Sequence, residues 1–186
     1  MIMSRLKQAT QTLHHEVEAL MPVMRPSLSR GEYTWLLGQL CGVVQPIEAR
    51  LLTLPLPASF DLDLRLKAPL LVRDLGALTQ TPAAQLLPAP APHLPGVPEA
   101  LGALYVLEGA TLGGQVISRR LRQTLGVTPE WGGAYFYAYG PGTGRMWRAF
   151  GEVMNRCVAP GDEARVVAGA QATFRAFGHA LGGVPA

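Results

Sequence analysis

The chain has 186 residues, of which 48% are hydrophobic and only 16% are charged. This composition excludes a disordered chain and provides enough apolar surface for the core of one domain spanning residues 1–186. The net charge of +3 is carried by scattered Lys and Arg, which is too weak a signal for nucleic-acid binding. The chain also lacks an amino-terminal signal region and an apolar run of the roughly 18 residues that a membrane span requires. We therefore expect a cytoplasmic protein without nucleic-acid or membrane partners.

Patterns typical of helices follow one another along the chain. Apolar residues recur at three- and four-residue steps, whereas strand-like alternation is nearly absent. The expected helices are residues 4–21, about 29–52, 64–78, 99–125, 144–156 and 162–181. The sequence thus predicts an all-α fold, a single domain of about six or seven helices.

Individual residues mark the ends of these helices. Ser29, with Glu32 three residues later, forms a capping-box pattern, and Gly126 ends the fourth segment. Asp162 is placed to cap the last helix, and Pro46 is expected to kink the second one. Two further segments are expected to be loops, namely residues 81–98, with six prolines, and the Gly- and Tyr-rich residues 131–144.

His14 is the first candidate for chemistry. It lies three or four residues from Thr10 and Val17, at the edge of the apolar stripe of the first helix, where a neutral imidazole could bind iron. Glu18, one turn later, could accept a hydrogen bond from the other ring nitrogen and strengthen the ligand. This spacing alone is more often that of a half-buried structural histidine. His15 points about a quarter-turn away, towards solvent, and is the weaker candidate.

A glycine-rich stretch is the second candidate. Gly109, Gly113 and Gly114 lie inside one helical pattern, although each costs about 1 kcal/mol relative to Ala in a helix interior. Close helix packing would explain them, and so would a flat ligand lying against exposed backbone with the helix bent over it. Gly109 and Gly113 are four residues apart and share a face, and such a bare face suits a large planar macrocycle.

Two motifs resemble the heme oxygenase family. The segment LKQATQTLHHEVE, residues 6–18, is similar to the opening helix of the family, in which a threonine four residues before a histidine precedes the proximal ligand. His14 takes the ligand position. The segment LYVLEGATLGGQVI, residues 104–117, is similar to the distal helix, and YGPGTGRMWRAF and TFRAFGHAL also resemble bacterial members. The resemblance therefore extends over nearly the whole chain.

This resemblance implies an all-α fold that holds heme between the first helix and the distal helix, with His14 as the iron ligand. Heme would be both substrate and cofactor, and with O2 and external electrons it would be cleaved to biliverdin, CO and ferrous iron. A ferredoxin, a flavodoxin or a reductase would supply the electrons, and a phytochrome could use the biliverdin. Bare backbone at Gly109 and Gly113 would let oxygen bend towards the edge of the ring.

One position departs from the family pattern. Animal-type members carry an aspartate directly after the first distal glycine, where it holds waters that deliver protons, and this chain has Ala110 there. Thr111, Glu108 and Gln115 are the side chains nearby that could hold waters instead.

Further heme contacts are expected from several types of side chain. Lys7 lies two turns before His14 and matches a basic family position, so it could bind a propionate, as could Arg145, Arg148 or Arg175. An ordinary solvated surface charge explains each of these residues as well. The heme-binding set is Lys7, His14, Glu18, Tyr105, Gly109, Gly113, Gly114, Tyr137, Arg148 and Phe174, of which Phe174 could equally belong to the core.

Three other functions were weighed against this one. A thiaminase-like or quinone-cofactor enzyme of the same fold would use pocket acids or cysteines, but Cys41 and Cys157 have no neighbouring base and are expected to be buried thiols. A non-enzymatic heme carrier or sensor would use the same His14 and glycines, and Ala110 keeps it open. A di-iron bundle requires Glu-x-x-His pairs, which are missing.

Overall fold

The computed structural model describes residues 1–79 and 91–182, and every regular element in these ranges is helical. The helices are α1 (Ile2–Leu20), α2 (Arg30–Leu52), α3 (Ala68–Leu78), α4 (Val97–Leu125), α5 (Ala134–Tyr137), α6 (Thr143–Cys157) and α7 (Glu163–Leu181). Short 3₁₀ turns lie at Pro22–Met24, Ala58–Phe60, Leu62–Arg65, Gly140–Gly142 and Pro160–Asp162. The predicted all-α fold is confirmed.

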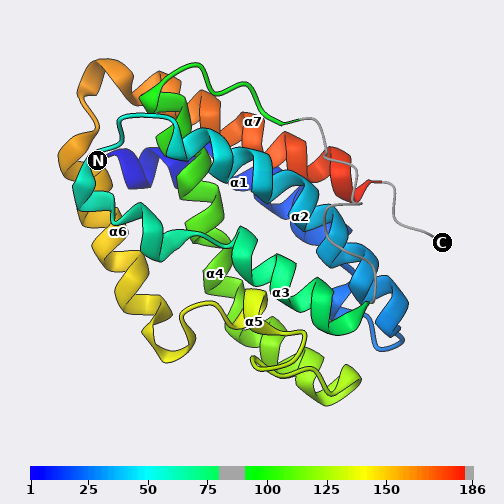
Figure 1. Ribbon diagram of the computed structural model, residues 1–186. Helices are drawn as coiled ribbons and strands as arrows, with labels where there is room; N and C mark the ends of the chain where they lie inside the picture. The colour runs from blue at the N-terminus through cyan, green and yellow to red at the C-terminus, as the bar shows by residue number, and fades with distance from the viewer. Residues whose placement is uncertain (80–90, 183–186) are drawn as a thin grey trace.

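Helix α4 passes through the middle of the molecule in Figure 1, between α6 on one side and the group of α1, α2 and α7. Helix α7 contacts α1, α2 and α4, and α3 packs on α2. By length and composition α4 is apolar enough to span a membrane, but 56% of its most apolar window is buried inside the protein. This burial is what a central core helix requires.

The crossing of α4 and α7 depends on two glycines. A Cβ atom on Gly102 would lie 2.0 Å from the carbonyl oxygen of Val166, and one on Gly169 would lie 2.1 Å from that of Glu99. No side chain fits in either place, so the two backbones approach closely. Arg165 on α7 links the two helices near Gly102 and Gly169, because its Nε and Nη2 donate to the two carboxylate oxygens of Glu99 on α4 at 2.8 and 3.1 Å.

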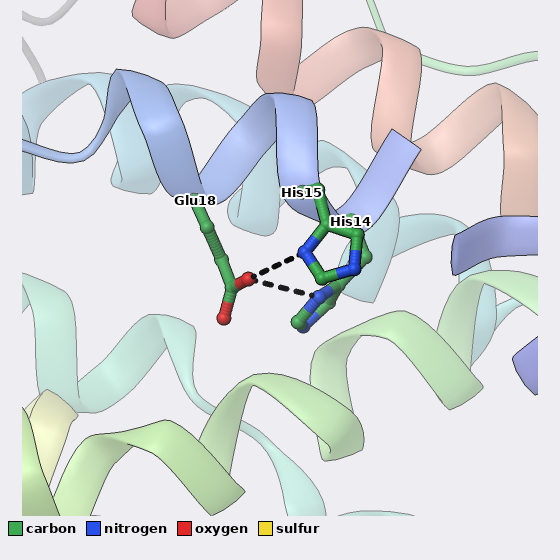
Figure 2. Close-up of side chains that lie close together, drawn as sticks. All are labelled: His14, His15 and Glu18. Carbon is green, nitrogen blue, oxygen red and sulfur yellow. Dashed lines mark ion pairs between the residues drawn. The ribbon is translucent and has the colours of Figure 1, made fainter. Parts of the chain in front are cut away.

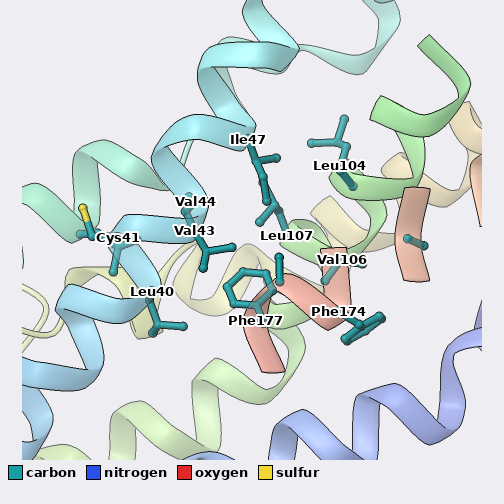
Figure 3. Close-up of a cluster of buried hydrophobic side chains, with 14 of the residues drawn as sticks. Leu40, Cys41, Val43, Val44, Ile47, Leu104, Val106, Leu107, Phe174 and Phe177 are labelled. Carbon is teal, nitrogen blue, oxygen red and sulfur yellow. The ribbon is translucent and has the colours of Figure 1, made fainter. Parts of the chain in front are cut away.

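The core fills the space between α2, α4 and α7. Figure 3 shows side chains of these three helices converging, and all of the labelled residues are buried. They are Leu40, Cys41, Val43, Val44, Ile47, Leu104, Val106, Leu107, Phe174 and Phe177. Burial of this apolar surface contributes roughly 25 cal/mol per Å² to stability and fixes the rotation of α4 about its axis. Gly113, on a later turn of α4, is thereby left exposed.

The ends of the helices confirm some sequence predictions and correct others. Ser29 and Glu32 form the expected capping box, with Glu32 N donating to Ser29 Oγ at 3.1 Å and Ser29 N to Glu32 Oε2 at 2.7 Å. Gly126 ends α4 with a left-handed φ of 70°. Asp162 stands at the N-cap position of α7 as predicted, but its carboxylate makes no capping hydrogen bond and instead accepts from Arg165 Nη1 at 3.3 Å.

The segment expected to be a plain loop at residues 131–144 contains α5 and a 3₁₀ turn. Asp74, on α3, explains the helix, because its carboxylate accepts hydrogen bonds from the backbone N–H groups of Ala134 at 2.9 Å and Tyr135 at 2.8 Å. This cap comes from 60 residues away and is invisible to local patterns. Helix α4 also begins earlier than expected, since Pro98 suits a first helical turn. Residues 81–90 of the expected proline loop lie outside the described residues.

The predictions for α2 and for the cysteines have mixed outcomes. Helix α2 continues on both sides of Pro46, and the kink there stays a prediction. Both cysteines are free thiols, as expected. Cys41 is buried, but Cys157 is only partly buried at the end of α6, so the expectation of two buried thiols is wrong for Cys157.

Candidate functional site

His14, His15 and Glu18 form a cluster on α1. Figure 2 shows both imidazoles turned towards the Glu18 carboxylate. Oε2 of Glu18 lies 3.3 Å from Nδ1 of His14 and 3.4 Å from Nδ1 of His15. Half or more of each side chain is exposed. Glu18 therefore stands where an acceptor for Nδ1 of His14 was expected, and Nε2 of that ring is left to bind a ligand.

Contact with α7 distinguishes the two histidines. The ring of His14 meets the ring of Phe174 edge-on, with centroids 5.8 Å apart and planes at 83°. Phe174 is buried, so it offers a fixed apolar wall against one side of His14. His15 has no ring contact of this kind to α7 among the described residues. His14 is thus the better oriented of the two, in agreement with the sequence prediction.

The three glycines of α4 have different surroundings. A Cβ atom on Gly113 would meet no described atom within 4 Å, and one on Gly109 would meet only the indole of Trp147, at 3.7 Å. On Gly114 it would lie 2.3 Å from the carbonyl oxygen of Phe136, in α5. Close packing therefore explains why position 114 is a glycine. Gly109 and Gly113 remain as the two residues that leave the backbone of α4 bare of side chains. Trp147, beside Gly109, is a residue that the sequence motifs did not assign to this face.

Helices α1 and α4 meet one turn before these residues. A side-chain hydrogen bond between Thr10 and Tyr105 partly offsets the burial that raises the pKa of Tyr105. Thr10 lies four residues before His14, and Tyr105 lies four residues before Gly109, so each pair shares a helix face. Both helices run towards the lower right of Figure 1 from their N-terminal ends. His14 and Gly109 consequently lie one turn beyond the same contact, on the same side of it.

The open side of α4 carries exposed apolar side chains. Leu112 is 45% exposed and Val116 is 60% exposed. The hollows of the described structure include one of about 10 Å³ beside Ala110 and Thr111 and one of about 470 Å³ between Leu51 and Leu64. Neither lies between His14 and Gly113. His14 and Gly113 are both exposed, and the apolar side chains beside Gly113 suit an apolar ring.

The expected basic contacts lie where α1 meets α6. Met3 packs on Gly151, with 3.5 Å between the Met3 methyl and a Cβ atom placed on the glycine. Lys7 comes one turn after Met3, and Arg148 comes about one turn before Gly151. Both side chains are exposed, and neither has an ion pair or hydrogen bond among the described residues. Arg145 and Arg175 are exposed as well.

Tyr137 belongs to a different part of the structure. Its ring lies against Gly140, and its carbonyl oxygen accepts from Nε2 of Gln115 at 3.2 Å. These contacts place Tyr137 beside the packed side of α4, with Gly114. No described contact brings it to His14 or to Gly113, and its predicted role at the heme stays a prediction.

A buried cluster of charges behind α4 was missed by sequence reasoning. The carboxylate of Glu108 is 1% exposed and accepts hydrogen bonds from Arg65 Nη1, from Lys67 Nζ at 2.7 Å and from Tyr139 Oη at 2.7 Å. Burial and the nearby Glu108 charge raise the pKa of Tyr139. These partners are 31 to 43 residues from Glu108 in the sequence, so no local pattern could have joined them.

The side chains considered as replacements for an acid at Ala110 are all engaged on that packed side. Glu108 is held by the buried cluster, Thr111 Oγ1 donates to the Glu108 carbonyl oxygen at 2.7 Å, and Gln115 bonds Tyr137. Ala110 itself is exposed. No titratable side chain of α4 between Gly109 and Gly114 therefore reaches the open face.

Comparison with solved structures defines the fold. The chain is similar over 97% of its length to a heme oxygenase from Neisseria meningitidis, with 24% identity, 90% of that chain covered and a TM-score of 0.75. A heme oxygenase from Leptospira interrogans matches with 17% identity, 97% of this chain and 98% of that one, and a TM-score of 0.75. Heme oxygenase-1 from Synechocystis sp. PCC6803, solved in complex with heme, matches with 14% identity, 97% and 90% coverage, and a TM-score of 0.71. The chain therefore has the heme oxygenase fold.

The C-terminal half of the sequence is similar to a family model. Residues 92–181 match the family model described as heme oxygenase, which confirms the resemblance read from the distal-helix motif. The segment with His14 lies outside the matched residues. A search of curated proteins found no match.

Proposed function

We propose that this protein is a heme oxygenase, which binds heme between α1 and α4 and, with O2 and external electrons, cleaves it to biliverdin, CO and ferrous iron. The family match and the fold support this activity. The observation that carries it is the pairing of a free imidazole nitrogen with bare backbone. His14 turns Nδ1 to Glu18, and across from it Gly113 has open space where a side chain would be.

The residues at this surface fit heme by their chemistry. His14 would bind the iron through Nε2, while Glu18 holds the tautomer and Phe174 limits the rotation of the ring. Gly109 and Gly113 would leave room on the opposite side, with Trp147 beside Gly109 as an aromatic wall. When bound, heme supplies the iron that activates oxygen and is itself the group oxidised.

Charges at the α1–α6 junction suit the propionates of heme. Lys7 and Arg148 are exposed and have no carboxylate partner among the described residues, so they are free to pair with an anion. Tyr105 stands between them and the glycines, with its ring 5.6 Å from that of Trp147. We assign the polar edge of heme to this junction and its apolar edge to the side of Leu112 and Val116.

The physiological setting belongs to the same proposal. We place the protein in the cytoplasm, where a ferredoxin, a flavodoxin or a reductase would supply electrons through the basic rim of the site. A phytochrome that uses biliverdin is the partner proposed for the product.

The test is to mix the purified protein with hemin and ascorbate in air and to identify the pigment. A heme oxygenase gives a Soret band that disappears as biliverdin forms and CO is released. A stable Soret band without pigment would instead show a heme carrier, the alternative that Ala110 keeps open. His14→Ala should lose the axial nitrogen and the turnover, whereas full activity with unchanged iron spectra in that variant would refute the ligand assignment.

A further inference from the structure

We propose that His14, His15 and Glu18 bind a divalent transition metal ion, with Zn²⁺ as its best match, and that an ion bound there excludes heme from His14. The geometry of α1 carries the metal site by itself, whereas the exclusion of heme rests on the proposed function.

His15 has no part in the proposed heme site, yet it faces the same carboxylate as His14. Figure 2 shows both imidazoles turned towards Glu18. A single oxygen, Oε2 of Glu18, lies 3.3 Å from Nδ1 of His14 and 3.4 Å from Nδ1 of His15. An acceptor that served only to orient His14 would not need the second ring. Two ring nitrogens and a carboxylate oxygen are therefore offered to one point.

The spacing of these atoms fits the ligands of a metal ion. Zn²⁺ binds imidazole nitrogen and carboxylate oxygen at about 2.0–2.2 Å, so neighbouring ligand atoms around a tetrahedral ion lie roughly 3.3–3.6 Å apart. Both nitrogen–oxygen distances fall in this range, and one ligand atom from each residue lies within 4.8 Å of the other two. Because half or more of each side chain is exposed, small rotations can complete the geometry.

The helix arranges the ligands in advance. His14 and Glu18 lie one turn apart on α1 and share a face. The ring of His14 also meets the buried ring of Phe174 edge-on, with centroids 5.8 Å apart, which limits its orientation. A ligand held in place before binding loses less freedom when the ion arrives.

The donor atoms select the class of ion. Two imidazoles with one carboxylate suit Zn²⁺ and other divalent first-row ions, whereas Ca²⁺ and Mg²⁺ prefer oxygen ligands only. Soft ions such as Cu⁺ prefer thiolates and thioethers, which this set lacks. Three protein ligands leave the fourth position of Zn²⁺ to water, and the exposed side chains give the ion direct access from solvent.

The metal ion and heme compete through the two nitrogens of His14. A neutral imidazole carries one proton, and when Nδ1 donates it to Glu18, Nε2 is free to bind the heme iron. An ion on Nδ1 leaves the proton on Nε2, which then has no lone pair for iron. The proton changes nitrogen by exchange with water, and no electron moves. Both metals could bind one ring only if it lost both protons, so each excludes the other.

Zinc titration of the heme-free protein by calorimetry tests the metal site. The wild type should bind one Zn²⁺ per chain, and His15→Ala and Glu18→Gln should each weaken this affinity about tenfold or more, since each loses a ligand. His93→Ala removes an exposed histidine from the segment before α4 and should change nothing. Equal zinc affinity in the wild type and His15→Ala would overturn the site.

Heme titration followed by the Soret band tests the exclusion. Zn²⁺ at about ten times its own dissociation constant should raise the apparent dissociation constant of heme about tenfold in the wild type, and EDTA should reverse this. In His15→Ala, which keeps the heme ligand, the same zinc concentration should leave heme affinity unchanged. Wild-type heme affinity that is insensitive to saturating zinc would overturn the exclusion. A wild type that binds zinc but no heme would overturn the proposed function, and one that binds heme but no zinc would overturn the metal site alone.

Discussion

Gly113 and Gly114 are neighbours in α4, and alanine should have opposite effects on stability at the two positions. At Gly113 a new Cβ atom meets no described atom within 4 Å, so the substitution gains helix propensity of about 1 kcal/mol without a clash. For a chain of this size, that gain raises the thermal midpoint of the heme-free protein by roughly 2–4 °C. At Gly114 the Cβ atom lies 2.3 Å from a backbone oxygen of Phe136, so α5 must shift, and overpacking of about 1–3 kcal/mol outweighs the gain.

Activity should follow a different order from stability. Gly113→Ala adds a methyl group to the surface assigned to heme, and a clash there of about 1–3 kcal/mol would weaken heme binding or slow biliverdin formation about tenfold or more. The measurements are circular dichroism melting of the heme-free proteins, heme titration by absorbance and the initial rate of pigment formation. A Gly113→Ala protein that is more stable and fully active would show that the bare backbone has no role in the reaction. Unchanged stability in Gly114→Ala would refute the packing argument.

Three further outcomes are expected. His15→Ala should keep the axial spectrum and the turnover of the wild type while His14→Ala loses both, and equal loss in the two variants would place the ligand assignment in error. Arg165→Met removes the paired hydrogen bonds to Glu99, but because half of the Arg165 side chain is exposed it should lower the unfolding free energy only slightly, with the difference shrinking in high salt. Burial raises the pKa of Glu48 above its ordinary value near 4.5, so the stability linked to its proton is complete below that value and is lost as the pH rises through the folded-state pKa. Glu48→Gln should therefore give a flatter dependence of the unfolding free energy on pH above 4.5 in urea titrations, and an equal slope in both proteins would contradict the shift.

The sequence predicts the helices well because their apolar periodicity is local. Six of the expected segments correspond to α1, α2, α3, α4, α6 and α7, and the capping box at Ser29 and Glu32 is confirmed. Asp162 failed as a cap because Arg165, one turn away, takes its carboxylate. Helix α5 was missed because its cap is Asp74, which only the tertiary fold brings to it.

In the candidate site, too, the local features could be predicted from the sequence and the long-range contacts could not. The spacing of His14 and Glu18 along one helix is local, and the structure places the carboxylate beside Nδ1 as expected. The three glycines could not be separated by sequence, since close packing and a ligand face both call for the absence of a side chain. Only the position of Phe136, more than 20 residues further along the chain, distinguishes Gly114 from Gly113. The partners of Glu108 are also distant in the sequence. Because the sequence does not reveal these partners, Glu108 was interpreted as a side chain free to hold water.

Helix α4 is the element on which the proposed heme site depends, because it separates an open face from a packed one. Core side chains such as Leu104 and Leu107 fix its rotation, and a wrong rotation of one residue, about 100°, would exchange bare backbone for a bulky side chain at the open face. The same rotation keeps Glu108 against Lys67 and Arg65. A buried carboxylate that lost these cations would be strongly destabilising, by about 3–5 kcal/mol, so the cluster resists that rotation. The charges behind α4 therefore hold Gly109 and Gly113 in place on the open face.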